Sequence, residues 1–64
     1  MNLQLTKSGM EFFSTQSTNI TLILKDDGGI SLYIEKNNVV YNICKSFVEL
    51  KALVDLGFIR ITTN

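Results

Sequence analysis

Apolar and polar residues alternate in two successive runs in the middle of the chain. The first run extends from Asn19 to Lys25 and the second from Ile30 to Lys36. Side chains that recur at every second residue lie on one face of an extended strand. The pattern therefore predicts two strands that share one buried face, whose apolar residues are Ile20, Leu22, Leu24, Ile30, Leu32 and Ile34.

The segment between these runs, Asp26 to Gly29, predicts a tight hairpin. A three-residue loop that ends at Gly28 pairs Leu24 with Ile30 and keeps the apolar residues on one face, whereas a two-residue loop mixes the two faces. A one-residue slip moves every side chain to the opposite face, so the register is strongly selected. We predict the three-residue loop, with Gly28 in the left-handed conformation that such a loop requires.

The pair Asn37-Asn38 predicts a second hairpin, because Asn tolerates the positive φ angles of a type I′ turn. A two-residue loop there pairs Ile34 with Tyr41 and Leu32 with Ile43, which extends the same apolar face onto a third strand. The turn chemistry and the side-chain period thus agree. Together they predict a three-stranded antiparallel meander.

The segment after the meander carries the signals of a short helix. Ser46 and Glu49 have the spacing of a capping box, and Gly57 is placed for a left-handed helix end. Alternation resumes from Phe58 to Thr63 and predicts a C-terminal strand, reached by a right-handed crossover. The helix is expected over residues 47–56, with one apolar stripe that packs on the sheet: Phe47, Leu50, Leu53 and Val54.

The first eighteen residues predict a small N-terminal β-hairpin. Apolar residues alternate from Met1 to Leu5, residues 7–9 have the composition of a turn, and residues 10–13 form the return strand. The whole chain, residues 1–64, is therefore predicted to be one small α+β domain. Its elements are the N-terminal hairpin, the three-stranded antiparallel meander, one amphipathic helix packed on the sheet and the C-terminal strand.

Composition narrows the chemistry that the chain can perform. It has 64 residues with six basic and six acidic side chains, no His and one Cys. A net charge of zero gives no electrostatic footprint for nucleic acid, and the absence of His removes the commonest general base and transition-metal ligand. Cys44 has no neighbouring base, and Asp26 and Asp27 fit a hairpin loop better than a metal site. We therefore predict a non-enzymatic protein with no catalytic residue, metal or cofactor.

The sequence also carries hints about location and source. No apolar run approaches the roughly 18 residues that a membrane-spanning helix needs, and no signal peptide begins at Met1. The expectation is a cytoplasmic protein with no membrane contact. Ile, Asn and Lys are frequent and Pro is absent, which is typical of AT-rich genomes such as those of low-GC bacteria and their phages.

The opposite face of the predicted meander has a mixed composition. Ile23, Tyr33 and Val40 lie there among polar residues, whereas a solvated sheet face is usually more uniformly polar. One aromatic and two aliphatic side chains inside a polar rim are typical of a protein interface. Two explanations stand at this point. The face contacts another protein, or the N-terminal hairpin covers it with its own apolar residues: Leu3, Leu5 or Phe12.

These patterns favour a small protein-binding module that forms a homodimer at or near Ile23, Tyr33 and Val40. A phage or mobile-element protein that modulates a host protein fits the size and composition. The alternative is a small nucleic-acid-binding regulator, made less favourable by the neutral charge. In that case a dimer would gather dispersed basic residues into one patch: Lys25, Lys36 and Arg60.

Overall fold

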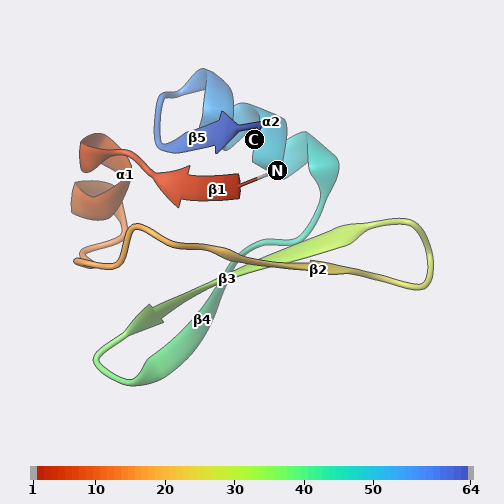
Figure 1. The fold of residues 1–64 in the computed structure, drawn as a ribbon. Helices are drawn as coiled ribbons and strands as arrows, with labels where there is room; N and C mark the ends of the chain where they lie inside the picture. The colour runs from red at the N-terminus through yellow and green to blue at the C-terminus, as the bar shows by residue number, and fades with distance from the viewer. Residues whose placement is uncertain (1, 64) are drawn as a thin grey trace.

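Five strands and two helices make up the computed structural model, which describes residues 2–63 (Figure 1). The α+β class is therefore confirmed. In chain order the elements are β1 (Asn2–Leu5), α1 (Lys7–Phe12), β2 (Thr21–Leu24), β3 (Ile30–Lys36), β4 (Val39–Cys44), α2 (Phe47–Asp55) and β5 (Ile59–Thr62).

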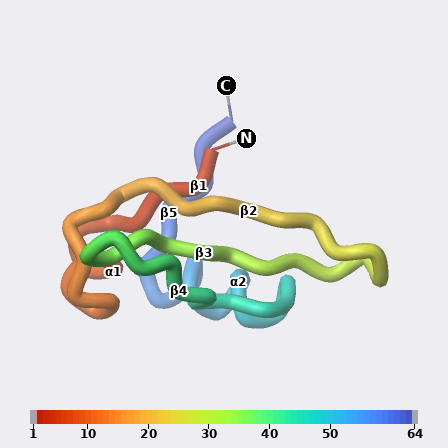
Figure 2. The backbone as a smooth tube through the Cα atoms, turned by 90° about the horizontal axis from the view of Figure 1, so that it is seen from below, coloured from red at the N-terminus to blue at the C-terminus, as the bar shows by residue number. Residues whose placement is uncertain are grey.

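The strands form two layers (Figure 1). One layer is the predicted meander, in which β3 lies between β2 and β4, as the view from below in Figure 2 also shows. The other layer is an antiparallel pair of β1 and β5, with the helices beside it. The chain just before β2 joins the layers, because Leu5 donates a backbone hydrogen bond to Thr18 and Ile20 donates one to Leu3.

The first hairpin has the predicted register. Leu24 pairs with Ile30, and the Lys25 N–H donates to the Gly29 carbonyl at 2.8 Å across a three-residue loop. Gly28 has a φ of 85°, a conformation in which a side chain would be strained. The requirement for one continuous apolar face therefore selected the loop length correctly.

The second hairpin has the predicted turn but a partly different register. Asn37 and Asn38 have φ angles of 53° and 64°, as a type I′ turn requires, and the expected pair of Ile34 and Tyr41 is present. The expected pair of Leu32 and Ile43 is wrong, because a β-bulge follows and Leu32 pairs with Cys44 instead.

The bulge moves Cys44 from the outside of the sheet to its buried side. An unbroken strand in the predicted register would place Cys44 on the opposite face with Val40, but its side chain is only 1% exposed, so that placement is wrong. The Asn42 side chain stabilises the irregularity, since its amide donates to the carbonyls of Leu32 (3.1 Å) and Cys44 (3.2 Å). An extra residue disrupts the ladder locally, and here a side chain supplies the hydrogen bonds.

The hydrophobic core lies between the two layers. Leu24 and Tyr41 were expected on the buried face, but both are exposed because the hairpin ends project past the β1–β5 layer (Figure 1). The core is thus centred on the middle of β3. Its buried members are Leu3, Leu5, Ile30, Leu32, Ile34, Cys44, Leu50 and Ile59.

The predicted N-terminal hairpin is wrong. Only its first strand forms, over the described residues Asn2–Leu5, and this strand pairs with β5. The expected turn at residues 7–9 is instead the start of α1, because the Thr6 hydroxyl caps the helix by accepting the Gly9 N–H at 3.1 Å. Met1 lies outside the described residues.

The one predicted helix is confirmed as α2, with both of its ends. Glu49 donates its N–H to the Ser46 hydroxyl at 3.1 Å, and its carboxylate accepts the Lys45 N–H at 2.9 Å. Gly57 has a φ of 82° just after the helix. Of the predicted apolar stripe only Leu50 is fully buried. The strand that follows, β5, pairs with β1 rather than joining the meander, so the expected crossover onto the meander is not formed.

None of the helices within residues 2–63 has the length and apolar character that crossing a membrane requires.

Candidate protein-binding surface

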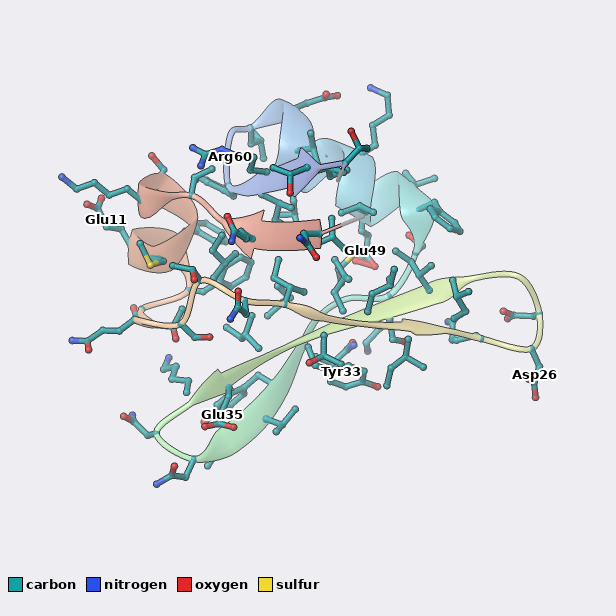
Figure 3. All side chains as sticks on the ribbon, viewed as in Figure 1. Glu11, Asp26, Tyr33, Glu35, Glu49 and Arg60 are labelled. Carbon is teal, nitrogen blue, oxygen red and sulfur yellow. The ribbon has the colours of Figure 1, made fainter. Side chains whose placement is uncertain are left out.

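One face of the meander, here called the outer face, is turned away from the β1–β5 layer (Figure 1). Figure 3 shows the Tyr33 side chain on this side. Tyr33 lies on the central strand, between Thr21 of β2 and Asn42 of β4. By strand register the outer face carries Thr21, Ile23, Ser31, Tyr33, Glu35, Val40 and Asn42.

The three residues predicted at an interface share this face, and two of them are exposed. Ile23 is 48% exposed and Val40 is 62% exposed, while Tyr33 between them is half-buried. Exposure of this extent is unfavourable for an apolar side chain, because the removal of apolar surface from water lowers the free energy. The outer face is thus an apolar centre within a polar rim.

The alternative explanation, that the N-terminal residues cover this face, is wrong. Leu3 and Leu5 belong to the core on the opposite side of the meander. Phe12 stacks on Phe58, with ring centroids 4.5 Å apart. The physical reason is the pairing of β1 with β5, which draws the first residues over the buried face of the meander.

The outer edge of β4 is a second exposed feature. The four residues from Val39 to Asn42 are all exposed, although three of them are large and apolar. The strand carries no charge over residues 39–44. The sequence analysis did not single out this edge. An uncharged run on the last strand of a meander is nevertheless a sequence signal for an unprotected edge strand.

A third apolar surface lies where α2 meets β5. Phe47, Leu50, Lys51, Val54 and Ile61 line a shallow groove of about 230 Å³. Its charged rim is locally neutral, because Lys51 forms an ion pair with Asp55 at 2.6 Å. The groove follows from the incomplete burial of the α2 stripe.

The reactive side chains of Asp27 and Cys44 have structural roles in the fold. Asp27 accepts the Gly29 N–H at 2.9 Å inside the first hairpin, as a turn residue does. Burial raises the pKa of the Cys44 thiol above its ordinary value of 9.0, and the negative charge of Glu49 adds to this effect. Among residues 2–63, no three His, Cys, Asp or Glu side chains lie together as a metal site would need.

The state of Cys44 leads to a testable expectation. A thiol reagent should modify Cys44 at least about tenfold more slowly in the folded chain than in urea, because only the exposed thiolate reacts. The folded rate should also begin to rise at a higher pH than the rate in urea, since burial raises the pKa of the thiol. Absorbance kinetics with a disulfide reagent give both rates, and equal rates in the two states would contradict the buried position.

The basic residues considered for nucleic acid are not gathered in one copy of the chain. Lys25 lies at the first hairpin, where its Nζ donates to the Lys45 carbonyl at 3.3 Å. Lys36 lies near the second hairpin and donates to the Phe13 carbonyl at 3.3 Å. Arg60 belongs to β5 in the other layer (Figure 3). The three residues therefore do not form a shared phosphate-binding patch.

The chain was compared with protein families, curated proteins and solved structures. No protein family, curated protein or solved structure matches the chain.

Proposed function

We propose that the chain is a small non-enzymatic module that binds another protein through its outer face. The observation that carries this proposal is the exposure of Ile23 and Val40 around the half-buried Tyr33, on the sheet face turned away from the β1–β5 layer. Tyr is enriched at the energetic centres of interfaces. The polar neighbours supply the rim that such a centre usually has.

The overall dimensions indicate that this exposure is a property of the surface and not of a loose fold. The accessible surface is 4488 Å². A folded monomer of this mass is expected to expose about 4,100 Å², so the excess is small. What is unusual is the kind of surface, because ten large apolar side chains are exposed among the described residues.

Burial of the two aliphatic residues would contribute strongly to binding. Full burial of a Val or Ile side chain is worth about 1.5–3 kcal/mol. Because Ile23 is only 48% exposed and Val40 62% exposed before binding, the two together supply about 1.7–3.3 kcal/mol, or at least about tenfold in affinity. An effect of this size is measurable by substitution.

The substitutions Ile23→Lys and Tyr33→Glu, made together, test the proposal. Both place a charge in the apolar centre, so we expect a loss of partner binding of at least about a hundredfold. Proteins captured from the native host by the wild-type chain are identified by mass spectrometry. The affinity of each purified candidate for wild type and variants is then measured by calorimetry.

The control for this experiment is Val48→Lys. Val48 is 80% exposed but lies on α2, away from the outer face, so its replacement should leave the affinity unchanged. Circular dichroism confirms that both variants are folded at the temperature used. A candidate that binds the double variant as tightly as wild type contradicts the outer face as its binding site.

We further propose that the chain works as a homodimer, in the setting of a phage or mobile-element protein that modulates a host protein. The support is physical: a chain of 64 residues has a thin core, and no disulfide links the described residues. Association with a second copy removes apolar surface that one copy leaves exposed.

The alternative function, nucleic-acid binding, gives a separate expectation. With its basic residues dispersed, the chain should bind DNA or RNA more weakly than about 100 µM, the weak limit of non-specific binding at physiological salt. Fluorescence titrations with labelled oligonucleotides at two salt concentrations measure this. Tight binding that falls steeply as salt is raised would favour the regulator over the protein-binding module.

A further inference from the structure

The sheet layers leave three strand edges that a further strand could approach, and they differ in accessibility. β5 has Arg60 in its middle, and a charged residue is a common protection of an edge strand. The edge of β2 is partly taken, because the preceding residues hydrogen-bond to β1. The edge of β4 is free and uncharged, and Figure 2 shows β4 outside β3.

The backbone of β4 is oriented for pairing at this edge. A two-residue hairpin loop is closed by a hydrogen-bonded pair, which here is Lys36 and Val39. Hydrogen-bonded and non-hydrogen-bonded pairs alternate along antiparallel strands. The N–H and C=O groups of Val40, opposite Glu35, therefore point away from β3 toward the free edge.

We propose that the edge of β4 pairs with β4 of a second copy of this chain, antiparallel across a two-fold axis at Tyr41. In this register Val40 forms a hydrogen-bonded pair with Asn42 of the second copy. The two Tyr41 residues face each other as a non-hydrogen-bonded pair, and Val39 lies beside Ile43, the bulged residue, of the second copy. All these pairs are uncharged, and aromatic and aliphatic cross-strand pairs are stabilising.

The charged residue in β5 distinguishes its edge from that of β4. A two-fold pairing of β5 centred on Arg60 would place this residue directly opposite Arg60 of the second copy, and like charges at that position repel. Residues 39–44 of β4 carry no charge, and the Nζ of Lys36 lies 5.6 Å from the Tyr41 ring centroid, where it contacts an aromatic face and not another cation. The edge of β4 is therefore complementary to itself.

Edge pairing also determines where the outer faces lie. The two-fold axis is perpendicular to the sheet, so both outer faces are on the same side of one six-stranded sheet. Tyr33 and Val40 of each copy then belong to a single doubled surface. A partner protein would bind across both copies, a consequence that rests on the proposed function, whereas the strand pairing itself does not.

A cysteine placed on the two-fold axis tests the register. The Cα atoms of a non-hydrogen-bonded pair are about 4.5 Å apart, which is within the range that a disulfide spans. We expect Tyr41→Cys to form a disulfide-linked dimer rapidly with diamide. Val39→Cys is the matched control, because its two copies would be about 14 Å apart along the paired strands. The native Cys44 is buried and does not compete.

A proline substitution tests the edge itself. Val40→Pro removes an N–H that faces the free edge but leaves the hydrogen bonds to β3 intact. We expect the dimer dissociation constant to rise at least about tenfold, since two symmetry-related hydrogen bonds are lost. The matched control is Ile61→Pro on the edge of β5, which should leave the dissociation constant unchanged. Sedimentation equilibrium from low micromolar to near-millimolar concentration measures both.

The outcomes separate this proposal from the proposed function. Faster cross-linking of Tyr41→Cys than of Val39→Cys, with weaker association of Val40→Pro, supports the β4 edge. A wild-type chain that stays monomeric throughout, or a dimer that Val40→Pro leaves intact, overturns it. Equal cross-linking rates for the two cysteine variants also overturn it. Loss of partner binding in the outer-face variant would still stand in each of those cases.

Discussion

Replacing Leu32 with Ala is expected to cost the chain a large part of its stability. Leu32 lies at the centre of β3 and is fully buried between the two layers. Leu-to-Ala changes in protein cores cost about 2.7–5 kcal/mol, and a chain of 64 residues has only about 3–10 kcal/mol in total. Urea denaturation followed by circular dichroism should show the midpoint lowered by at least about a quarter.

The control for this expectation is Leu24→Ala. Leu24 lies on the same face of the neighbouring strand, but it is 72% exposed at the projecting end of the hairpin. Its replacement should change the free energy of unfolding by less than about 1 kcal/mol, because little apolar surface is lost from the core. Similar losses at the two positions would contradict the placement of the core at the middle of β3.

Replacing Gly9 with Ala is expected to have a comparable effect for the opposite reason. Helix α1 lies so close to the segment before β5 that a Cβ at Gly9 would be 2.0 Å from the Phe58 carbonyl oxygen. This neighbour is backbone, and it also accepts the Thr6 N–H at 3.0 Å, so it cannot move freely. Overpacking costs about 1–3 kcal/mol and sometimes more, and we expect the upper end.

The matched control is Gly29→Ala. A Cβ at Gly29 would meet the flexible side-chain ends of Lys25 and Asp27, which can shift at little cost. Thermal denaturation should therefore show a large loss for Gly9→Ala and a small one for Gly29→Ala. A Gly9→Ala variant as stable as the wild type would show that α1 does not dock against Phe58.

The meander and α2 were readable from the sequence because their signals are local. The side-chain period and the turn residues Gly28 and Asn37-Asn38 specify the same register independently. The capping residues Ser46 and Glu49 likewise mark the start of α2 within four residues. Each of these choices depends on neighbours close in the chain.

The N-terminal segment was misread because its structure depends on distant residues. Gly9 is a poor helix former, and it suits α1 only because Phe58 leaves no room for a side chain. The pairing of β1 with β5 joins the two ends of the chain, for example Leu5 with Ile59. Nothing in the local pattern of residues 1–13 encodes that contact.

The bulge in β4 was missed for a related reason. The apolar pattern of residues 39–44 fits an unbroken strand equally well, so the sequence favoured Ile43 rather than Cys44 on the buried face. The irregularity depends on the Asn42 amide, which reaches the Leu32 carbonyl on the neighbouring strand. A polar side chain with this role has no distinctive signature in a single sequence.

The sequence predicted which residues share the candidate surface, but it did not predict whether that surface is exposed. Strand register alone places Ile23, Tyr33 and Val40 on one face. Whether that face is open depends on where β1 lies, which is a long-range property. The sequence therefore left two explanations, and the position of Leu3 and Leu5 in the core removes one of them.

The most direct test of the outer face as a binding surface is chemical-shift mapping by NMR. The ¹⁵N-labelled chain is titrated with a purified partner, and the amide shifts are compared along the chain. The account predicts the largest changes at and around Ile23, Tyr33 and Val40, with small changes at Val48 on α2. Changes centred instead on the groove of Phe47, Val54 and Ile61 would contradict it.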